Sequence, residues 1–179
     1  MELNLDILKS KLPDYARDIK INLSNVLTEE GAPGLNNMQI AGIALASAYA
    51  TKNKEFIKDM ESLLNSELDA EHLNAVKISV SIMAMNNIYY RFLHLAHDDD
   101  LMQLPAGLRM QSMSKHGISG TDFELYSIAV SSITGCGMCI ESHNQTLQKK
   151  HGVAVQAVQS CIRIAAVMHA VAQVLNMES

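Results

Sequence analysis

Proline is scarce in this sequence: the 179 residues include 3, at Pro13, Pro33 and Pro105. None of them interrupts the long apolar segments, so a helix can continue through each segment. These segments are rich in Ala, Met, Leu, Ile and Ser and do not alternate β-branched with polar residues, which argues against strands. The sequence therefore predicts an all-α fold in a single domain over residues 1–179.

The apolar periodicity predicts nine helical segments, with boundaries loose by a few residues. They cover residues 4–10, 14–28, 36–49, 54–64, 70–95, 106–115, 121–134, 137–150 and 154–176. A faint internal repeat relates residues of about 36–95 to those of about 121–176, each copy being a helix pair followed by a long helix. Only the second copy carries cysteines, since the first has Thr51 and Lys54 where the second has Cys136 and Cys139.

Clustered positive charge is also missing. The net charge is −5, the pI is near 5.8, and no basic run exceeds Lys149–Lys150. Nucleic-acid and anionic-membrane surfaces need an excess of Lys and Arg, so neither partner is expected. The first 20 residues lack the apolar core of a secretory signal, and the apolar stretch 35–51 is diluted with Asn, Gln, Ser and Gly. We expect a soluble, cytoplasmic protein.

Cysteine is the third scarce residue type, with 3 in the chain. Three cysteines cannot form a disulfide scaffold, and they are too few for the usual four-cysteine iron–sulfur site. Two of them, Cys136 and Cys139, lie close together in the segment ITGCGMCIESHNQTL. In a reducing compartment a close pair indicates metal binding or redox chemistry.

The segment around the cysteine pair reads as the start of a helix. Gly135 separates two helical patterns, and glycine readily ends a helix in the left-handed conformation. Cys136 then falls at the next helix start, Cys139 lies one turn inside, and His143 lies four residues further along the same face. A helix N-terminus favours a thiolate over a thiol. A disulfide at this spacing closes a very small loop, which suits a reversible redox couple better than a stabilising crosslink.

Glu124 is the fourth candidate residue. If the helices before and after Gly135 fold back as a hairpin, Glu124 and His143 reach similar depth. The carboxylate would then orient His143 and hold its proton, giving a relay from Glu124 through His143 to Cys139. Taken singly, Glu124 also suits a solvated first-turn acid, and His143 a surface histidine or one whose hydrogen bonds are satisfied in the interior.

Zinc binding is the competing interpretation, in a redox sensor or helical interaction protein without turnover. Cys136, Cys139 and His143 would supply three ligands, and Cys161 or His169 the fourth. Against it, a structural zinc site normally has a second ligand pair, and none is present. Cys161 lies in a long apolar helix, where a small buried side chain is the more usual role. A thioredoxin fold is disfavoured because the βαβ pattern is absent.

The segments DFELYSIAVSSITGCGMCIESHNQTL (122–147) and MAMNNIYYRFLHL (83–95) resemble the alkyl hydroperoxide reductase D (AhpD) family of the carboxymuconolactone decarboxylase-like superfamily. The likeness runs along nearly the whole chain. It implies an all-α homotrimer with peroxidase or thiol–disulfide oxidoreductase activity. Carboxymuconolactone decarboxylase itself lacks the cysteine pair, which disfavours decarboxylation.

The resemblance also implies a role for each site residue. Cys139 would be oxidised to a sulfenic acid, Cys136 would donate a proton and resolve the sulfenate to a Cys136–Cys139 disulfide, and Glu124 and His143 would form the relay. Helix-dipole reasoning alone favours Cys136 as the thiolate, whereas the partnership with His143 favours Cys139. We follow the resemblance and assign the peroxide reaction to Cys139.

The same resemblance implies no tightly bound cofactor and no metal. Reduced lipoyl groups of a dehydrogenase E2 component would supply electrons, and the peroxiredoxin AhpC would receive them, beside the direct hydroperoxide substrate. Met138 departs from the pattern, because known members have a histidine between the cysteines. Met138 is expected to shield the cysteines from water. The Ala- and Met-rich helices further predict self-association, since one short chain cannot cover so much apolar surface.

Overall fold

A computed structural model describes residues 3–178, and over this range the chain contains helices and no strands, which confirms the all-α prediction. The α-helices are α1 (Asp6–Ser10), α2 (Arg17–Val26), α3 (Asn37–Thr51), α4 (Lys54–Leu64), α5 (Ala70–Ala96), α6 (Asp99–Gln103), α7 (Gly120–Thr134), α8 (Gly137–Gln145) and α9 (Val155–Met177). Two 3-10 turns, Asp14–Ala16 and Gln111–Ser114, and a π-helical turn, Thr146–Lys150, complete the regular structure.

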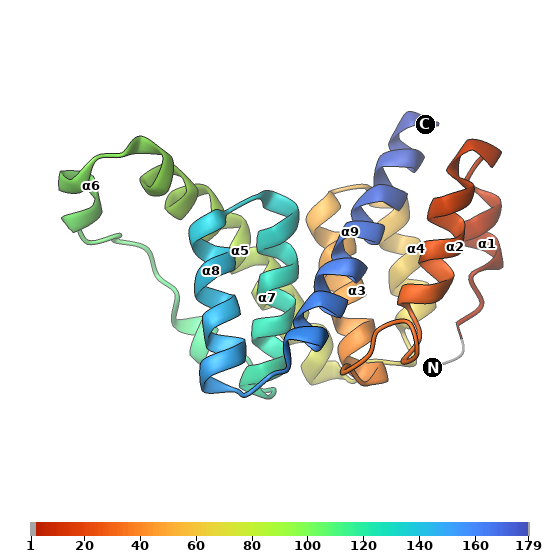
Figure 1. Ribbon diagram of the computed structural model, residues 1–179, viewed down its shortest axis with the longest axis horizontal. Coiled ribbons are helices and arrows are strands. Elements are labelled where there is room, and N and C mark those ends of the chain that lie inside the picture. The colour runs from red at the N-terminus through yellow and green to blue at the C-terminus, as the bar shows by residue number, and fades with distance from the viewer. Residues whose placement is uncertain (1–2, 179) are drawn as a thin grey trace.

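Helices α3 and α7 form the centre of the molecule. They pack on each other, α9 crosses both of them, and α5 packs along α7 and α3 (Figure 1). Every residue from Ile40 to Ala48 in α3 is buried, which explains why this helix is apolar on all sides. Small side chains let the helices approach closely: Gly42 lies against the ring of Tyr126 on α7. By length and composition α9 could cross a membrane, but 56% of its most apolar window is buried inside the molecule, as in a core helix.

The central helices begin where side-chain caps satisfy their first free N–H groups. Asn36 caps α3 in a capping box with Gln39, Asp69 caps α5, and Ser119 caps α7. The first two caps lie next to the predicted starts at residues 36 and 70, and the third lies two residues before the predicted start at 121. In the described chain α3–α4–α5 and α7–α8–α9 share one order, a helix pair and then a long helix, which supports the internal repeat as a proposal.

The helix predicted over residues 106–115 is wrong. The chain is irregular from Leu104 to Met110 and then forms the 3-10 turn Gln111–Ser114. Pro105 restricts the residue before it, and Gly107 adopts a φ of +63°, which no right-handed helix contains. The short α6 lies between the predicted helices and was not predicted. Asp98 caps it by accepting hydrogen bonds from two backbone N–H groups. Figure 1 shows α6 and the end of α5 projecting from the body.

Candidate active site

The turn between α7 and α8 places the cysteine pair. Gly135 adopts the left-handed conformation, with φ +72°, and its N–H bonds to the carbonyls of Ser131 and Ser132. This confirms the predicted helix end. Cys136 is the N-cap of α8, and its Sγ accepts a hydrogen bond from the backbone N–H of Cys139 at 3.4 Å. The predicted single helix over 137–150 is α8 followed directly by the π-helical turn.

The two sulfurs differ in their access to solvent. Cys136 and Cys139 are joined by a disulfide, with their Cα atoms 5.3 Å apart. Cys136 is 0% exposed, whereas Cys139 is 7% exposed and lines a cavity. A reagent in the cavity therefore meets Cys139 first.

Glu124 and His143 form a hydrogen-bonded pair beside the disulfide. The two helices fold back at Gly135, and Glu124 Oε2 lies 2.7 Å from His143 Nδ1. This confirms the prediction that the two residues reach the same depth. Neither residue is exposed, and only 6% of His143 is accessible. The surface interpretations of Glu124 and His143 are therefore wrong.

The other ring nitrogen of His143 does not bond to a cysteine in the structure described. Its Nε2 lies 3.3 Å from the Sδ of Met83, a residue of α5 that is 1% exposed. The structure thus contains the Glu124–His143 contact, and among the described residues no hydrogen bond joins His143 to Cys139. Met83 is part of the site and was not predicted as such.

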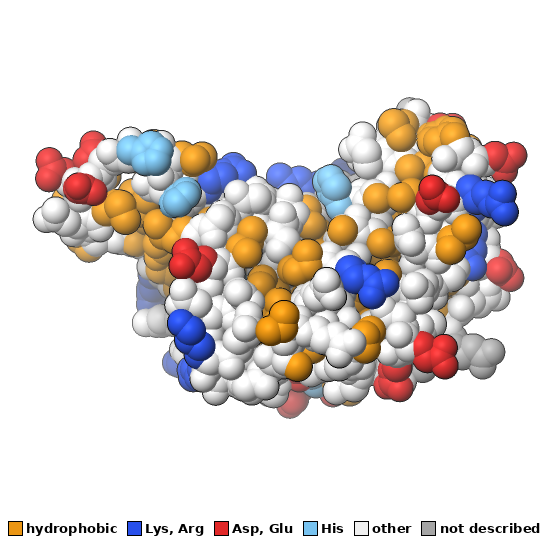
Figure 2. Space-filling model, viewed as in Figure 1, with side chains coloured by type: hydrophobic (Ala, Val, Ile, Leu, Met, Phe, Trp, Pro, Cys, Tyr) orange, Lys and Arg blue, Asp and Glu red, His pale blue; other side chains and the backbone are white. Residues whose placement is uncertain are grey.

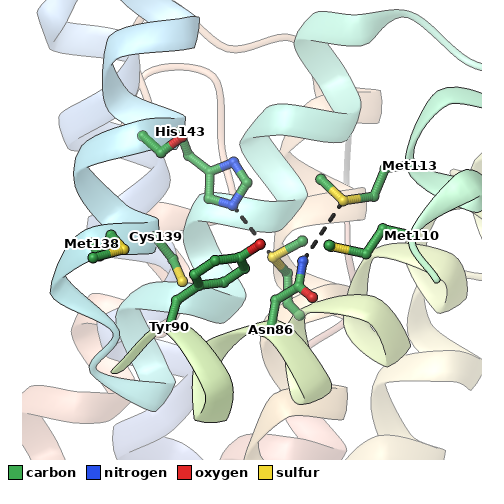
Figure 3. A pocket seen from close by; sticks show the side chains of 9 residues that line it. Asn86, Tyr90, Met110, Met113, Met138, Cys139 and His143 are labelled. Atoms are coloured by element: carbon green, nitrogen blue, oxygen red, sulfur yellow. Dashed lines mark hydrogen bonds between the residues drawn. The ribbon is translucent and has the colours of Figure 1, made fainter. Parts of the chain in front are cut away.

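A cavity of about 350 Å³ opens between α5, α8 and the 3-10 turn. Side chains from the three elements point toward one another across it (Figure 3). The lining residues are Met83, Asn86, Tyr90, Met110, Met113, Met138, Cys139, Ser142 and His143. Met138 is partly buried and lines the cavity together with Cys139, and its shielding of the cysteines stays a prediction.

The α5 residues of this cavity share one helix face. Met83, Asn86 and Tyr90 are spaced by three and four residues, so their side chains lie above one another. This spacing is visible in the sequence, but it does not say which helix the face meets. The pairing of α5 with α8 supplies that information.

Hydrogen bonds from α5 hold the end of α7 in place. Asn87 donates to Thr134 Oγ1 at 2.6 Å and accepts from Ser131 Oγ at 3.1 Å. Arg91 donates to the Thr134 backbone carbonyl, also at 2.6 Å. Thr134 is the last residue of α7, so these bonds fix the backbone from which the cysteine turn begins.

The described residues contain no group of three or more His, Cys, Asp or Glu side chains arranged to hold a metal. Cys161, one proposed fourth zinc ligand, is fully buried and donates to the Leu125 carbonyl at 3.3 Å. Leu125 lies about 14 Å along α7 from Thr134, at 1.5 Å per residue, so Cys161 is remote from the pair. His169, the other proposed ligand, lines a separate small cavity with Ser132 and Ile133.

Comparison with known proteins identifies the family. Residues 99–177 match the Carboxymuconolactone decarboxylase family. Alkyl hydroperoxide reductase AhpD of Coxiella burnetii (strain Dugway 5J108-111) is 50% identical over 175 residues, which cover 98% of each chain. The AhpD proteins of Rhodospirillum centenum and Maricaulis maris are 43% and 42% identical, over 99% of this chain and 93% and 100% of their own. The chain therefore belongs to the alkyl hydroperoxide reductase AhpD family.

Proposed function

We propose that this protein reduces organic hydroperoxides through the Cys136–Cys139 pair, with Cys139 as the sulfur that attacks the peroxide. The difference in access to the cavity carries this proposal. Cys139 faces the cavity next to the Glu124–His143 pair, whereas Cys136 is sealed beneath it. A hydroperoxide entering from solvent meets Cys139 and the imidazole together.

The oxidative steps follow from that placement. The Cys139 thiolate attacks the terminal peroxide oxygen, the O–O bond breaks, and the departing alkoxide takes a proton to become an alcohol. Cys139 is left as a sulfenic acid. Cys136 then attacks this sulfur, water leaves, and the disulfide closes. Cys136 gives up its thiol proton in this step, as the proton donor and resolving residue.

The cavity suits a substrate with an alkyl group. Four methionines line it, and their thioether side chains are apolar and adaptable. Tyr90, Ser142 and Asn86 supply a few polar groups among them, a composition common in sites for small organic molecules.

Reduction needs an external dithiol, and we assign a reduced lipoyl group to this role. A donor thiolate reaches Cys139 first and forms a mixed disulfide, and Cys136 leaves as a thiolate. The N-terminus of α8 stabilises that thiolate, because Cys136 accepts the Cys139 N–H there. The helix dipole thus stabilises the Cys136 thiolate as it leaves, and His143 acts on Cys139, the sulfur that attacks the peroxide. No tightly bound cofactor is required.

Family membership supports a proposal for two partners. A lipoyl-bearing E2 component would be the electron source, and the peroxiredoxin AhpC a second electron acceptor besides free hydroperoxide. Both reactions belong in the cytoplasm, which we propose as the location.

Self-association as a homotrimer is also proposed. Ile88, Phe92 and Leu95 are 59%, 56% and 62% exposed, and their spacing places them on one face of α5. Met102 and Leu104, in and after α6, add to this apolar surface. Figure 2 shows hydrophobic side chains on the projecting arm. An apolar face of this kind is typical of a subunit contact.

Sulfenic acid trapping tests the assignment of the two cysteines. Reduced Cys136→Ser should react once with cumene hydroperoxide and stall as a Cys139 sulfenic acid, which dimedone labels and mass spectrometry locates. Reduced Cys139→Ser should give no label. Both variants should lose turnover driven by reduced lipoamide, because the disulfide needs both sulfurs.

Cys161→Ser is the matched control, since its thiol lies in the core, and its activity should equal that of the unmodified chain. Dimedone on Cys136 in the Cys139→Ser protein, with none on Cys139 in the other variant, would reverse the assignment.

A further inference from the structure

The contact between His143 and Met83 has a chemical direction. A thioether sulfur accepts hydrogen bonds and has no proton to donate. The 3.3 Å contact between His143 Nε2 and Met83 Sδ is therefore a hydrogen bond when Nε2 carries the proton. If Nε2 were bare, two lone pairs would face each other in a buried site.

The contact of the other ring nitrogen, Nδ1, determines how many protons the Glu124–His143 pair holds. Nδ1 and Glu124 Oε2 are 2.7 Å apart, which requires one proton between them. With a second proton on Nε2, the pair is either imidazolium with carboxylate or imidazole with carboxylic acid. Both forms have zero net charge, whereas a pair with a single proton would be an uncompensated buried anion.

We propose that Met83 is a positioning residue of the redox site, whose sulfur holds the His143 Nε2 proton and keeps the Glu124–His143 pair doubly protonated while the disulfide is closed. This inference extends the proposed function, because it says where the proton for disulfide reduction is stored.

The stored proton has a use in the second reductive step. After the mixed disulfide forms on Cys139, the second thiolate of the dithiol attacks the donor sulfur. The bond from that sulfur to Cys139 breaks, and the electron pair remains on Cys139. The Nε2 proton passes to this thiolate, and the proton released by the second donor thiol replaces it. His143 lies one turn from Cys139 on α8, so a small ring movement away from Met83 redirects the proton.

No other group around His143 is seen to accept a hydrogen bond from Nε2 in the described residues. Tyr90 approaches from α5, and its hydroxyl points into the same cavity (Figure 3). Burial lowers the pKa of His116, which stacks on Phe123 and interacts with Glu124, so His116 is neutral at pH 7. Arg91 on α5 is engaged with the Thr134 carbonyl. Among the described contacts of Nε2, Met83 is the acceptor.

Nitrogen-15 NMR of the disulfide form tests which ring nitrogens of His143 carry a proton, without any turnover. In the unmodified chain Nε2 of His143 should be protonated at pH 7. Met83→Leu keeps the volume and removes the acceptor, so at pH 7 the Nε2 proton signal of His143 should be lost to exchange with solvent. Met83→Gln, which restores an acceptor, should recover most of this signal. Met60→Leu is the matched control, because Met60 is a buried methionine of α4 that does not line the cavity.

Single-turnover reduction by dithiothreitol gives the kinetic counterpart. Met83→Leu should slow it about three- to tenfold at pH 8, with recovery in Met83→Gln and no change in Met60→Leu. A bare Nε2 in the unmodified disulfide form, or an unchanged Nε2 proton signal in Met83→Leu, overturns the inference. Slow reduction with an unchanged NMR signal also overturns it, since repacking alone would then explain the rate. Absence of hydroperoxide reduction would defeat the proposed function while leaving the NMR result intact.

Discussion

At the scale of single residues, the Glu124–His143 pair is the most specific feature of the site. The carboxylate orients the imidazole by a 2.7 Å hydrogen bond inside a helix hairpin, and the imidazole lines the same cavity as Cys139. Replacing His143 with Gln should lower peroxide reduction by roughly 10²–10⁴-fold, the range for a lost acid–base group. Glu124→Gln should lower it less, because a neutral amide still holds the ring. Peroxide consumption driven by reduced lipoamide measures both.

Glu141→Gln serves as the control for these variants. Glu141 lies on the same helix but is exposed, and it bonds only to the nearby Gln145 among its described contacts. Its removal should leave the rate unchanged. Equal activity of His143→Gln and Glu141→Gln would return His143 to a purely structural role.

The three cysteines should differ in reactivity after reduction. Burial strongly raises the pKa of the Cys161 thiol, so at pH 7 it remains protonated and shielded. Iodoacetamide on the reduced, folded protein should label Cys139 first and leave Cys161 unlabelled until denaturant is added. Peptide mass spectrometry gives the order. Labelling of Cys161 in the folded state at the rate of Cys139 would contradict this burial.

The relative placement of the candidate residues could be predicted from their spacing along the chain. Cys136, Cys139 and His143 lie on one short helix, and Glu124 follows from folding that helix back at Gly135. Met83 was missed for a physical reason. Its role depends on the packing of α5 against α8, and helical periodicity records a buried face without recording its partner.

At the scale of elements, the sequence predicted helices where caps and composition agree, and failed where they conflict. The segment 106–115 has apolar residues at helical spacing, but Pro105 and Gly107 set a backbone that no helix can extend. The irregular path brings Met110 and Met113 to the cavity, so the misassigned segment contributes to the site.

The attachment of α5 to α7 should matter for both stability and chemistry. Asn87→Ala removes partners from Ser131 and Thr134, and leaving buried polar groups unpaired costs about 1–3 kcal/mol. Chemical denaturation should show this loss in the free energy of unfolding. Peroxide reduction should fall as well, because the α7 end positions Cys136. Ser81→Ala is the control, since its hydroxyl is exposed on α5 and bonds within its own helix. Equal stability of the two variants would exclude this anchoring role.

At the scale of the whole molecule, the uneven distribution of apolar surface predicts the assembly. The core is complete around α3, α7 and α9, yet the outer face of α5 and the α6 arm keep large apolar side chains in solvent. A lone chain gains nothing from such an arm, whereas subunits around a three-fold axis would each cover the arm of a neighbour.

Phe92→Glu tests this assembly against a matched control. Phe92 on α5 is 56% exposed and Ile21 on α2 is 57% exposed, so both positions tolerate a charge in the isolated chain. Light scattering should find a trimer for the unmodified protein and for Ile21→Glu, and dissociated chains for Phe92→Glu, because a buried unpaired carboxylate opposes association. The exposed apolar residues of α5 begin at Ile88, close to the cavity residues Asn86 and Tyr90. Dissociation should therefore also lower peroxide reduction by loosening that helix. A trimer that survives Phe92→Glu and dissociates with Ile21→Glu would move the contact to the α2 side of the molecule.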